Sequence, residues 1–142
     1  MTTKSMITTA AAVAAATLAI LTPTAFATGT RVQFDTAVVQ AKGAGVAATV
    51  TVTCDPYVDV WGNAMTSTPV DIAITQALPK SLITSATGEG TVACDSTPHD
   101  VTVLIAPSTY PYRRGPALVW VTPTFDNATT PAVLAGITVK IR

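Results

Sequence analysis

From Thr30 onward, apolar residues recur at every second position of this chain. Five segments show the pattern, with Val, Ile or Cys on one parity and mostly Thr, Ala or Asp on the other: residues 46–54, 70–75, 91–95, 101–105 and 137–142. A period of two places successive side chains on opposite faces of a strand, whereas an amphipathic helix needs a period of 3.6. The alternation therefore predicts an all-β chain with one face of each strand on a core.

Two further strands are expected to be irregular. In residues 31–41 the apolar parity shifts between Phe34 and Val39, which indicates a β-bulge or a strand that changes sheets. In residues 117–121 both faces are apolar, which predicts a strand that is covered on both sides or lies in the centre of a sheet. We expect Trp120, in this second segment, to belong to the core.

Turn-forming residues lie between these segments and mark the connections. They include Gly43, Gly45, Pro56, Pro79, Gly88, Gly90, Pro98, Pro107, Pro111, Gly115 and Pro131. Seven or eight short strands with such turns predict an antiparallel β-sandwich of immunoglobulin-like topology, and a closed barrel is the alternative. A chain of 142 residues has the length of one domain.

The first 27 residues differ in kind from the rest. Lys4 precedes an apolar run at residues 10–21, and Pro23 and two small residues, Ala25 and Ala27, follow it. These are the parts of a secretory signal peptide, so we predict cleavage after Ala27 and a mature domain of residues 28–142. A membrane anchor is the alternative, but the run is shorter than the ~20 apolar residues that cross a bilayer. We therefore expect a secreted protein with no stable membrane insertion after cleavage.

Cys54 and Cys94 are the only cysteines, and both lie on the inward parity of their segments. In an exported chain an isolated pair is first interpreted as a disulfide, here between strands. A redox or metal-binding pair is the alternative, but it would need C-x-x-C spacing or further ligands. We predict a buried Cys54–Cys94 bridge.

The charge balance excludes some classes of partner. Removing residues 1–27 takes away one charge, Lys4, and leaves seven Lys and Arg against eight Asp and Glu. A nucleic-acid-binding domain usually carries an excess of basic residues that neutralises phosphates. We therefore expect no nucleic-acid partner and no tight attachment to anionic lipid.

Nothing in the sequence forms a convincing catalytic or metal-binding pattern. Ser96, His99 and Asp100 lie close together, but a triad needs its base oriented in space between nucleophile and carboxylate. We interpret this segment as a polar turn in which Asp95 and Ser96 cap backbone amides. The carboxylates also lack the spacing of a glycosidase pair or a calcium loop. We predict that the protein is not an enzyme and binds no metal or cofactor.

Two loops, residues 55–68 and 108–115, are rich in the residue types that dominate binding hot spots. Their candidate ligand-binding residues are Tyr57, Trp61, Tyr110, Tyr112, Arg113 and Arg114. If both loops lie at the same end of the fold, they form one recognition surface. The alternative is that the aromatic rings cover the open ends of the core while the arginines remain solvated.

Three short segments resemble a group of small secreted proteins of high-GC Gram-positive bacteria. They are Gly-Thr-Val-Ala-Cys-Asp at residues 90–95, Pro-His-Asp-Val-Thr-Val at 98–103, and Tyr-Arg-Arg-Gly-Pro-Ala-Leu-Val at 112–119. Cys54 and Cys94 take the two cysteine positions of that group, and Ser96 stands where its members carry Gly. The resemblance spans residues 46–124 and implies an immunoglobulin-like sandwich with one disulfide. It implies no activity.

These observations lead to one functional hypothesis and one alternative. The first is a secreted, non-enzymatic module that binds an extracellular protein or glycan or belongs to the cell envelope. The alternative is a secreted inhibitor of an extracellular enzyme that acts through an exposed loop such as residues 108–115.

Overall fold

The computed structural model describes residues 24–27, 30–125 and 134–142, and this part of the chain is all-β, as predicted. Two short 3-10 turns, η1 (Ala41–Gly43) and η2 (Pro79–Ser81), accompany the strands. The strands are β1 (Thr24–Ala27), β2 (Thr30–Gln40), β3 (Gly45–Thr53), β4 (Tyr57–Val58), β5 (Ala64–Met65), β6 (Ser67–Leu78), β7 (Leu82–Ala93), β8 (Pro98–Ile105), β9 (Gly115–Pro123) and β10 (Leu134–Ile141).

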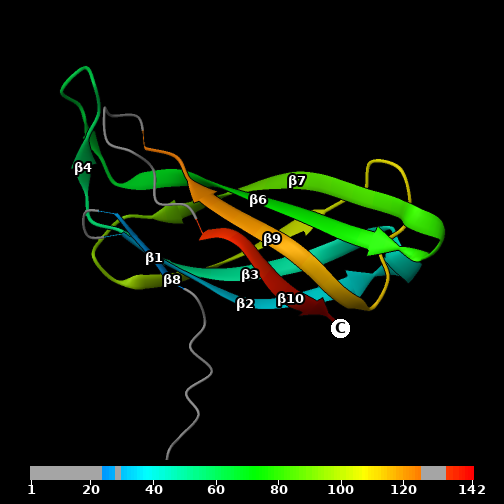
Figure 1. The fold of residues 1–142 in the computed structure, drawn as a ribbon. Coiled ribbons are helices and arrows are strands. Elements are labelled where there is room, and N and C mark those ends of the chain that lie inside the picture. Colours follow the sequence, from blue (N-terminus) through cyan, green and yellow to red (C-terminus); the bar gives the residue numbers. More distant parts are fainter. Residues whose placement is uncertain (1–23, 28–29, 126–133) are drawn as a thin grey trace, which may run out of the picture.

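One sheet contains all the longer strands, in the order β7-β6-β9-β10-β2-β3-β8, with β1 added beside β2. Its ladders are antiparallel except for the parallel contact between β10 and β2 at Ile141 and Ala37. The sheet curls until its two end strands, β7 and β8, pack on one another, so it is nearly barrel-shaped (Figure 1). No backbone ladder joins β7 to β8, both of which are fully described, so the hydrogen-bonded barrel does not close.

The period-two pattern produces the core that it predicts. Alternate residues of β3, β6, β7 and β8 point inward, and each fully buried Val or Ile contributes about 1.5–3 kcal/mol relative to its exposed state. This inward set comprises Val46, Val50, Val52, Val70, Ile72, Ile74, Val92, Val101, Val103 and Ile105. In β10, Ile141 is buried, whereas Ile137 and Val139 are half-buried.

The irregularity predicted in residues 31–41 is confirmed. The pairing of β2 with β3 shifts register between Phe34 and Thr36, as a bulge requires. Beyond the bulge the other edge of β2 meets the end of β10: the Val39 N–H donates to the Arg142 carbonyl at 2.8 Å, and the Arg142 N–H donates to the Ala37 carbonyl at 2.9 Å. The bulge therefore lies just before the segment of β2 that pairs with β3 on one edge and with β10 on the other.

The prediction for Trp120 is wrong. The strand that carries it, β9, lies inside the sheet between β6 and β10, but only one of its faces meets the core. Ala117, Val119 and Val121 occupy that face, so Trp120 points outward and is half-buried. Its indole ring lies against Gly136 of β10, where a Cβ would come within 3.8 Å of the ring nitrogen.

Gly88 and Gly90 do not form the turn that the sequence suggested. Both lie within β7 on its inward parity. A Cβ on Gly88 would lie 2.6 Å from a methyl carbon of Val103, and one on Gly90 would lie 2.9 Å from the same side chain. The glycines are therefore explained by the close approach of β8 to β7, not by a change in chain direction.

The predicted disulfide is confirmed. Cys54 follows β3 and Cys94 follows β7, their Cα atoms are 4.7 Å apart, and both side chains are buried. Two backbone hydrogen bonds support the same junction, from the Cys94 N–H to the Thr66 carbonyl at 2.7 Å and from the Ser96 N–H to the Cys54 carbonyl at 2.8 Å. The bridge links β7, at one end of the strand order, to β3 near the other.

The predicted signal peptide falls mainly outside the described residues, so the prediction of export is carried forward as a prediction. Only its last four residues, Thr24–Ala27, are described, and they form β1. Cleavage after Ala27 would remove β1 and leave the path of seven strands intact. Within the described ranges, none of the helical segments has the length and hydropathy of a membrane span.

Candidate functional site

The two aromatic loops lie at opposite ends of the molecule and do not form one surface. Residues 55–66 precede the first residue of β6, whereas residues 106–114 contact its last residues and the adjoining η2. In Figure 1 the first loop carries β4 at the left, and the second is the yellow connection at the right. Each loop is therefore a separate candidate site.

The first loop is a small hairpin with an exposed tip. Tyr57 at its base packs edge-on against Phe125, with ring centroids 5.1 Å apart, and its hydroxyl donates to the Ser67 carbonyl at 3.3 Å. At the tip, Trp61 is 74% exposed. Tyr57 therefore anchors the hairpin, while Trp61 is available to a partner.

In the second loop, Tyr112 does not fit the role of a ligand-binding residue. It is only 2% exposed, its hydroxyl donates to the Ile74 carbonyl at 3.3 Å, and its N–H donates to the Gly43 carbonyl at 3.0 Å. Gly43 adopts a φ of +97°, and a Cβ there would lie 2.3 Å from the Tyr112 carbonyl oxygen. Tyr112 closes this end of the core, which is the alternative that the sequence left open.

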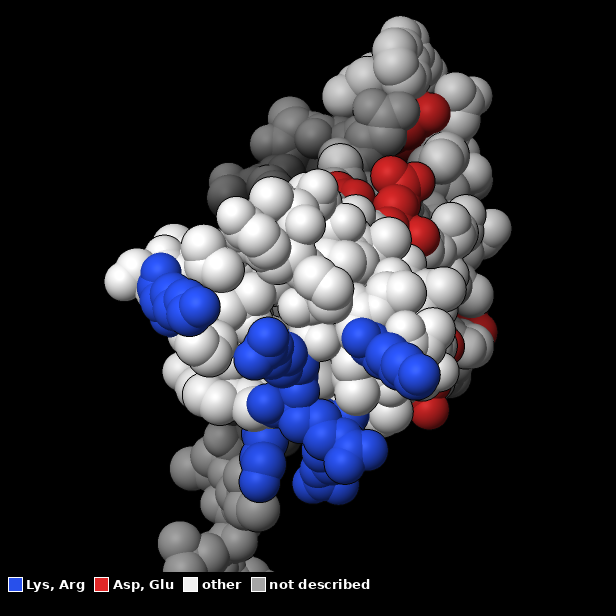
Figure 2. Space-filling model, turned by 90° about the vertical axis from the view of Figure 1, so that its right-hand side faces the viewer, with Lys and Arg blue, Asp and Glu red and all other residues white. Residues whose placement is uncertain are grey.

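The second loop lies at a strongly basic end of the molecule. Arg31 apart, every Lys and Arg that the structure describes is exposed at this end: Lys42, Lys80, Arg113, Arg114, Lys140 and Arg142. Figure 2 looks onto this end and shows the Lys and Arg side chains gathered on it. Among the described residues, none of these cations pairs with a carboxylate, so their charges are directed at solvent.

The described carboxylates lie in the middle of the sheet or toward the other end. They are Asp35, Asp55, Asp59, Asp71, Glu89, Asp95 and Asp100. The formal net charge of zero therefore conceals a molecule with one basic end and one acidic end. Such an arrangement attracts an anionic partner to the basic end over about a Debye length, ~8 Å at physiological salt.

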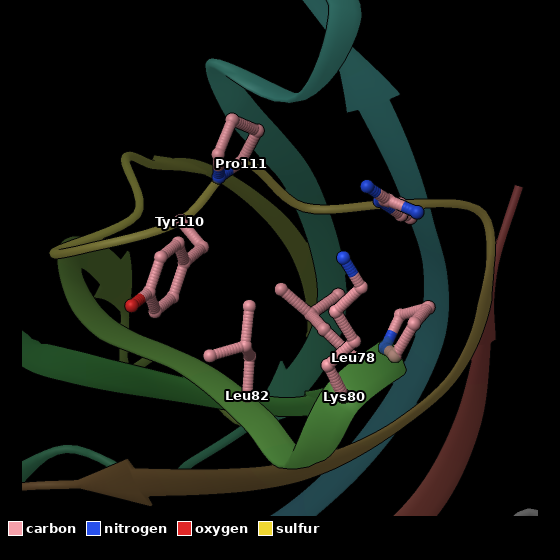
Figure 3. A pocket seen from close by; sticks show the side chains of 7 residues that line it. Leu78, Lys80, Leu82, Tyr110 and Pro111 are labelled. Carbon is pink, nitrogen blue, oxygen red and sulfur yellow. The ribbon is translucent and has the colours of Figure 1, made fainter.

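A pocket of about 320 Å³ opens at the basic end. Its lining residues are Leu78, Pro79, Lys80, Leu82, Tyr110, Pro111 and Arg113. Tyr110 lies on one side of it, Leu78 and Lys80 lie on the other, and Leu82 is between them (Figure 3). The pocket thus joins an apolar floor and one aromatic ring to two cationic side chains, and an apolar lining with a few charged groups is typical of small-molecule sites.

Two buried polar residues hold the loop that forms this pocket. Gln76, 2% exposed, donates to the Arg113 carbonyl at 2.7 Å and accepts from the Arg113 N–H at 2.8 Å. The buried Thr84 hydroxyl donates to the Tyr110 carbonyl at 2.6 Å. These bonds fix the backbone of Tyr110 and Arg113 and leave both side chains partly exposed, so the pocket is preorganised.

Replacing Gln76 by methionine should loosen this loop. Methionine has a similar shape but cannot pair with the Arg113 backbone, so we expect the free energy of unfolding to fall by about 1–3 kcal/mol. Amide exchange at Arg113 should become faster, as measured by NMR. Gln33→Met, at an exposed site of β2, is the matched control and should change neither quantity; equal effects of the two variants would contradict the role of Gln76.

The segment around His99 is the polar turn that the sequence suggested. The Asp95 carboxylate accepts from the Thr97 hydroxyl at 2.6 Å and the Thr97 N–H at 3.0 Å, and its Oδ1 lies 2.8 Å from His99 Nε2. The Thr97 hydroxyl, followed by His99, lowers the pKa of Asp95 to about 2. The capping role predicted for Ser96 is wrong: within the described residues its side chain makes no hydrogen bond, and its backbone adopts a φ of 66°, a conformation that favours glycine.

Comparison with family models, curated proteins and solved structures found no match to this chain. Within the described ranges, no cluster of His, Cys, Asp or Glu is suited to hold a metal ion. The candidate site therefore rests on its own geometry. Sequence reasoning identified Tyr110, Arg113 and Arg114 but missed Lys80, Leu78 and Leu82, which come from the β6–β7 turn.

Proposed function

We propose that the chain is an exported immunoglobulin-like sandwich. The strand order supports this proposal. It divides into β8-β3-β2 and β10-β9-β6-β7, which correspond to strands E-B-A and G-F-C-C′ of that fold. The parallel contact of β2 with β10 stands where the first strand of such a fold meets the last. The buried bridge between Cys54 and Cys94 is typical of proteins that mature in an oxidising compartment.

We further propose that the protein is a non-enzymatic binding module and that the pocket at its basic end is the binding site. One observation carries this proposal: Lys80 and Arg113 flank an apolar pocket whose loop is held by buried hydrogen bonds. A preorganised site loses less conformational entropy on binding than a mobile one. Unpaired surface cations alone would not select a ligand, but cations beside an aromatic ring and an apolar floor select for shape as well as charge.

The lining defines the chemistry of the ligand. A ring fits against Tyr110 and the leucines, and a negative group attached to that ring reaches Lys80 or Arg113. Acidic sugars and aromatic carboxylates both have this form. Arg114 is exposed beside Arg113 in the same loop and would extend the contact to a polymer with repeated negative charges.

The second candidate is an inhibitor that acts through residues 106–114. The pinned backbone of Tyr110 and Arg113 favours it, since a rigid exposed loop can enter a foreign enzyme with little loss of entropy. This role uses the same side chains. It differs from the first candidate in requiring a protein partner.

Retention on polymer beads tests the proposed site. The protein should bind alginate, whose sugar rings each carry a carboxylate, and should pass through neutral dextran. The double variant Lys80→Gln/Arg113→Gln should bind alginate about tenfold more weakly, because each lost ion pair contributes roughly 0.7 kcal/mol. Retention should weaken as NaCl rises from about 0.05 to 0.5 M.

The matched control is Lys42→Gln/Lys140→Gln, which removes the same net charge from the same end without altering the pocket lining. An equal loss of retention in both double variants would show diffuse electrostatic attraction and contradict a pocket. Failure of the wild-type protein to bind alginate would contradict recognition of ring-borne carboxylates.

A further inference from the structure

The acidic end of the molecule presents an unusual apolar projection. Val58, Val60 and Trp61 follow one another in the β4–β5 hairpin and are 58%, 58% and 74% exposed. Single exposed apolar residues are common, but neighbouring ones that include an indole mark a contact surface. Trp is also among the residues most often found at the centre of binding energy.

The tip of this hairpin is held in shape by its own hydrogen bonds. The Asp59 carboxylate accepts from the Trp61 N–H at 2.9 Å, the Asn63 N–H at 2.8 Å and the Asn63 side-chain amide at 3.0 Å. Desolvation opposes ionisation of Asp59, but the hydrogen bonds from Asn63 and Trp61 outweigh it and hold the pKa of Asp59 below its usual value. Trp61 therefore projects from a fixed backbone beside a carboxylate that is ionised at neutral pH.

This tip matches the chemistry of the pocket at the opposite end. The tip offers one aromatic ring with the Asp59 carboxylate beside it, and the pocket offers an apolar floor with Lys80 and Arg113 at its edge. A volume of about 320 Å³ is at the lower end of the range for ligand pockets and suits a single aromatic group. Because the two features lie at opposite ends of the sheet, a folded chain cannot fill its own pocket.

We propose that the pocket of one copy receives Trp61 of a second copy. This proposal rests on the proposed function, since it names the occupant of the same pocket: a ring beside an acidic group, supplied by the hairpin. Each copy has one tip and one pocket, on different surfaces, so the contact is heterologous. Repetition of such a contact links molecules head to tail into chains, with opposite charges facing one another at every junction.

Sedimentation velocity of the purified protein tests this arrangement between about 1 µM and 1 mM. The wild-type sedimentation coefficient should rise with concentration, and the rise should diminish at 0.5 M NaCl. Trp61→Ala, which lacks the tip, and Lys80→Gln/Arg113→Gln, which lacks the pocket charges, should each remain monomeric. Leu104→Ala, at a 67% exposed apolar site on β8, is the matched control and should associate like the wild type.

Mixing the two non-associating variants is the decisive step. One retains the pocket and the other retains the tip, so a head-to-tail contact allows a single junction between them. The mixture should form dimers and nothing larger. A monomeric mixture, or a wild-type protein that stays monomeric at 1 mM, would overturn the proposal. Alginate retention separates this failure from that of the proposed function. If Trp61→Ala binds alginate like the wild type and Lys80→Gln/Arg113→Gln binds it about tenfold more weakly, the pocket remains a binding site for another partner.

Discussion

Replacing Cys54 and Cys94 together by alanine should lower the free energy of unfolding by about 4 kcal/mol. The bridge spans a sequence separation of 40, and in the chain-entropy model a closed loop of this length restricts the unfolded state by about that amount. The effect is large beside the total stability of about 5–15 kcal/mol that is typical of a domain. Urea unfolding followed by circular dichroism measures it.

Reduction of the wild-type protein is the control for this prediction. Dithiothreitol should reduce its stability to nearly that of the double variant, because both lack the same cross-link. Equal stability of the oxidised wild type and the double variant would show that the bridge contributes nothing. If the reduced wild type is far less stable than the double variant, the fall in the free energy of unfolding comes from burying two thiols and not from losing the cross-link.

Tyr112→Ala should have an effect of similar size. Removing a large aromatic side chain from a buried site typically costs about 3–5 kcal/mol, through lost burial and the cavity that remains. The substitution also removes the hydroxyl that donates to the Ile74 carbonyl, whereas the backbone N–H that donates to the Gly43 carbonyl remains, so the loop over this end of the core should lose part of its support. Tyr112→Phe removes only the hydroxyl and should cost about 1 kcal/mol. Similar losses in the two variants would contradict a packing role for the ring.

The pH dependence of Tyr112 provides a second check. Burial raises the pKa of this phenol above its ordinary value of 10.0, so the folded state favours the neutral form. The resulting contribution of Tyr112 to the free energy of unfolding is fully present below pH 10, and it is lost as the pH rises through the folded-state pKa. Tyr112→Phe cannot ionise there, so its stability should fall less steeply than that of the wild type above pH 10. Parallel curves would show that Tyr112 is not protected from ionisation.

The strands and their inward faces were predictable because burial on one side of a strand leaves a direct trace in the sequence. Val70, Ile72 and Ile74 alternate with more polar neighbours, and all three are buried in β6. Trp120 shows the limit of this reasoning. When both parities are apolar, the pattern does not say which one faces the core. In β9 the smaller residues, Ala117, Val119 and Val121, face it.

Gly88 shows a second limit. Glycine in a sequence indicates either a turn or a place where another chain segment comes close, and the two have the same local signature. Only the packing of β8 on β7, between residues far apart in the sequence, distinguishes them. The prediction of a turn was therefore wrong even though the residue type was correctly singled out.

The candidate site was predictable only in part. Tyr110, Arg113 and Arg114 share one short loop, so composition alone singled them out. Lys80 comes from a different turn, and its place beside Arg113 depends on the β6–β7 hairpin. Gln76 did leave a signal, since it is a polar residue on the same inward parity of β6 as Val70, Ile72 and Ile74. That break in the pattern marks a side chain with a buried partner.

The separation of charge is the feature that composition concealed most completely. Eight positive and eight negative residues sum to zero, and a count along the chain shows no basic block. The antiparallel strands bring the turns at η1, η2 and residues 106–114 to one end together with the last residues of β10. A basic surface thus forms from several short segments, each of which contributes only one or two cations.

An NMR titration with a matched pair of small probes tests the binding pocket most directly. N-acetyl-tryptophan carries an indole ring and a carboxylate, and N-acetyl-tryptophan amide carries the same ring without the charge. The acid should shift the amide signals of residues 78–82 and 110–114 in a saturable manner, and the amide should do so much more weakly. Equal shifts from both probes, or shifts confined to other residues, would contradict an anion-selective pocket at the basic end.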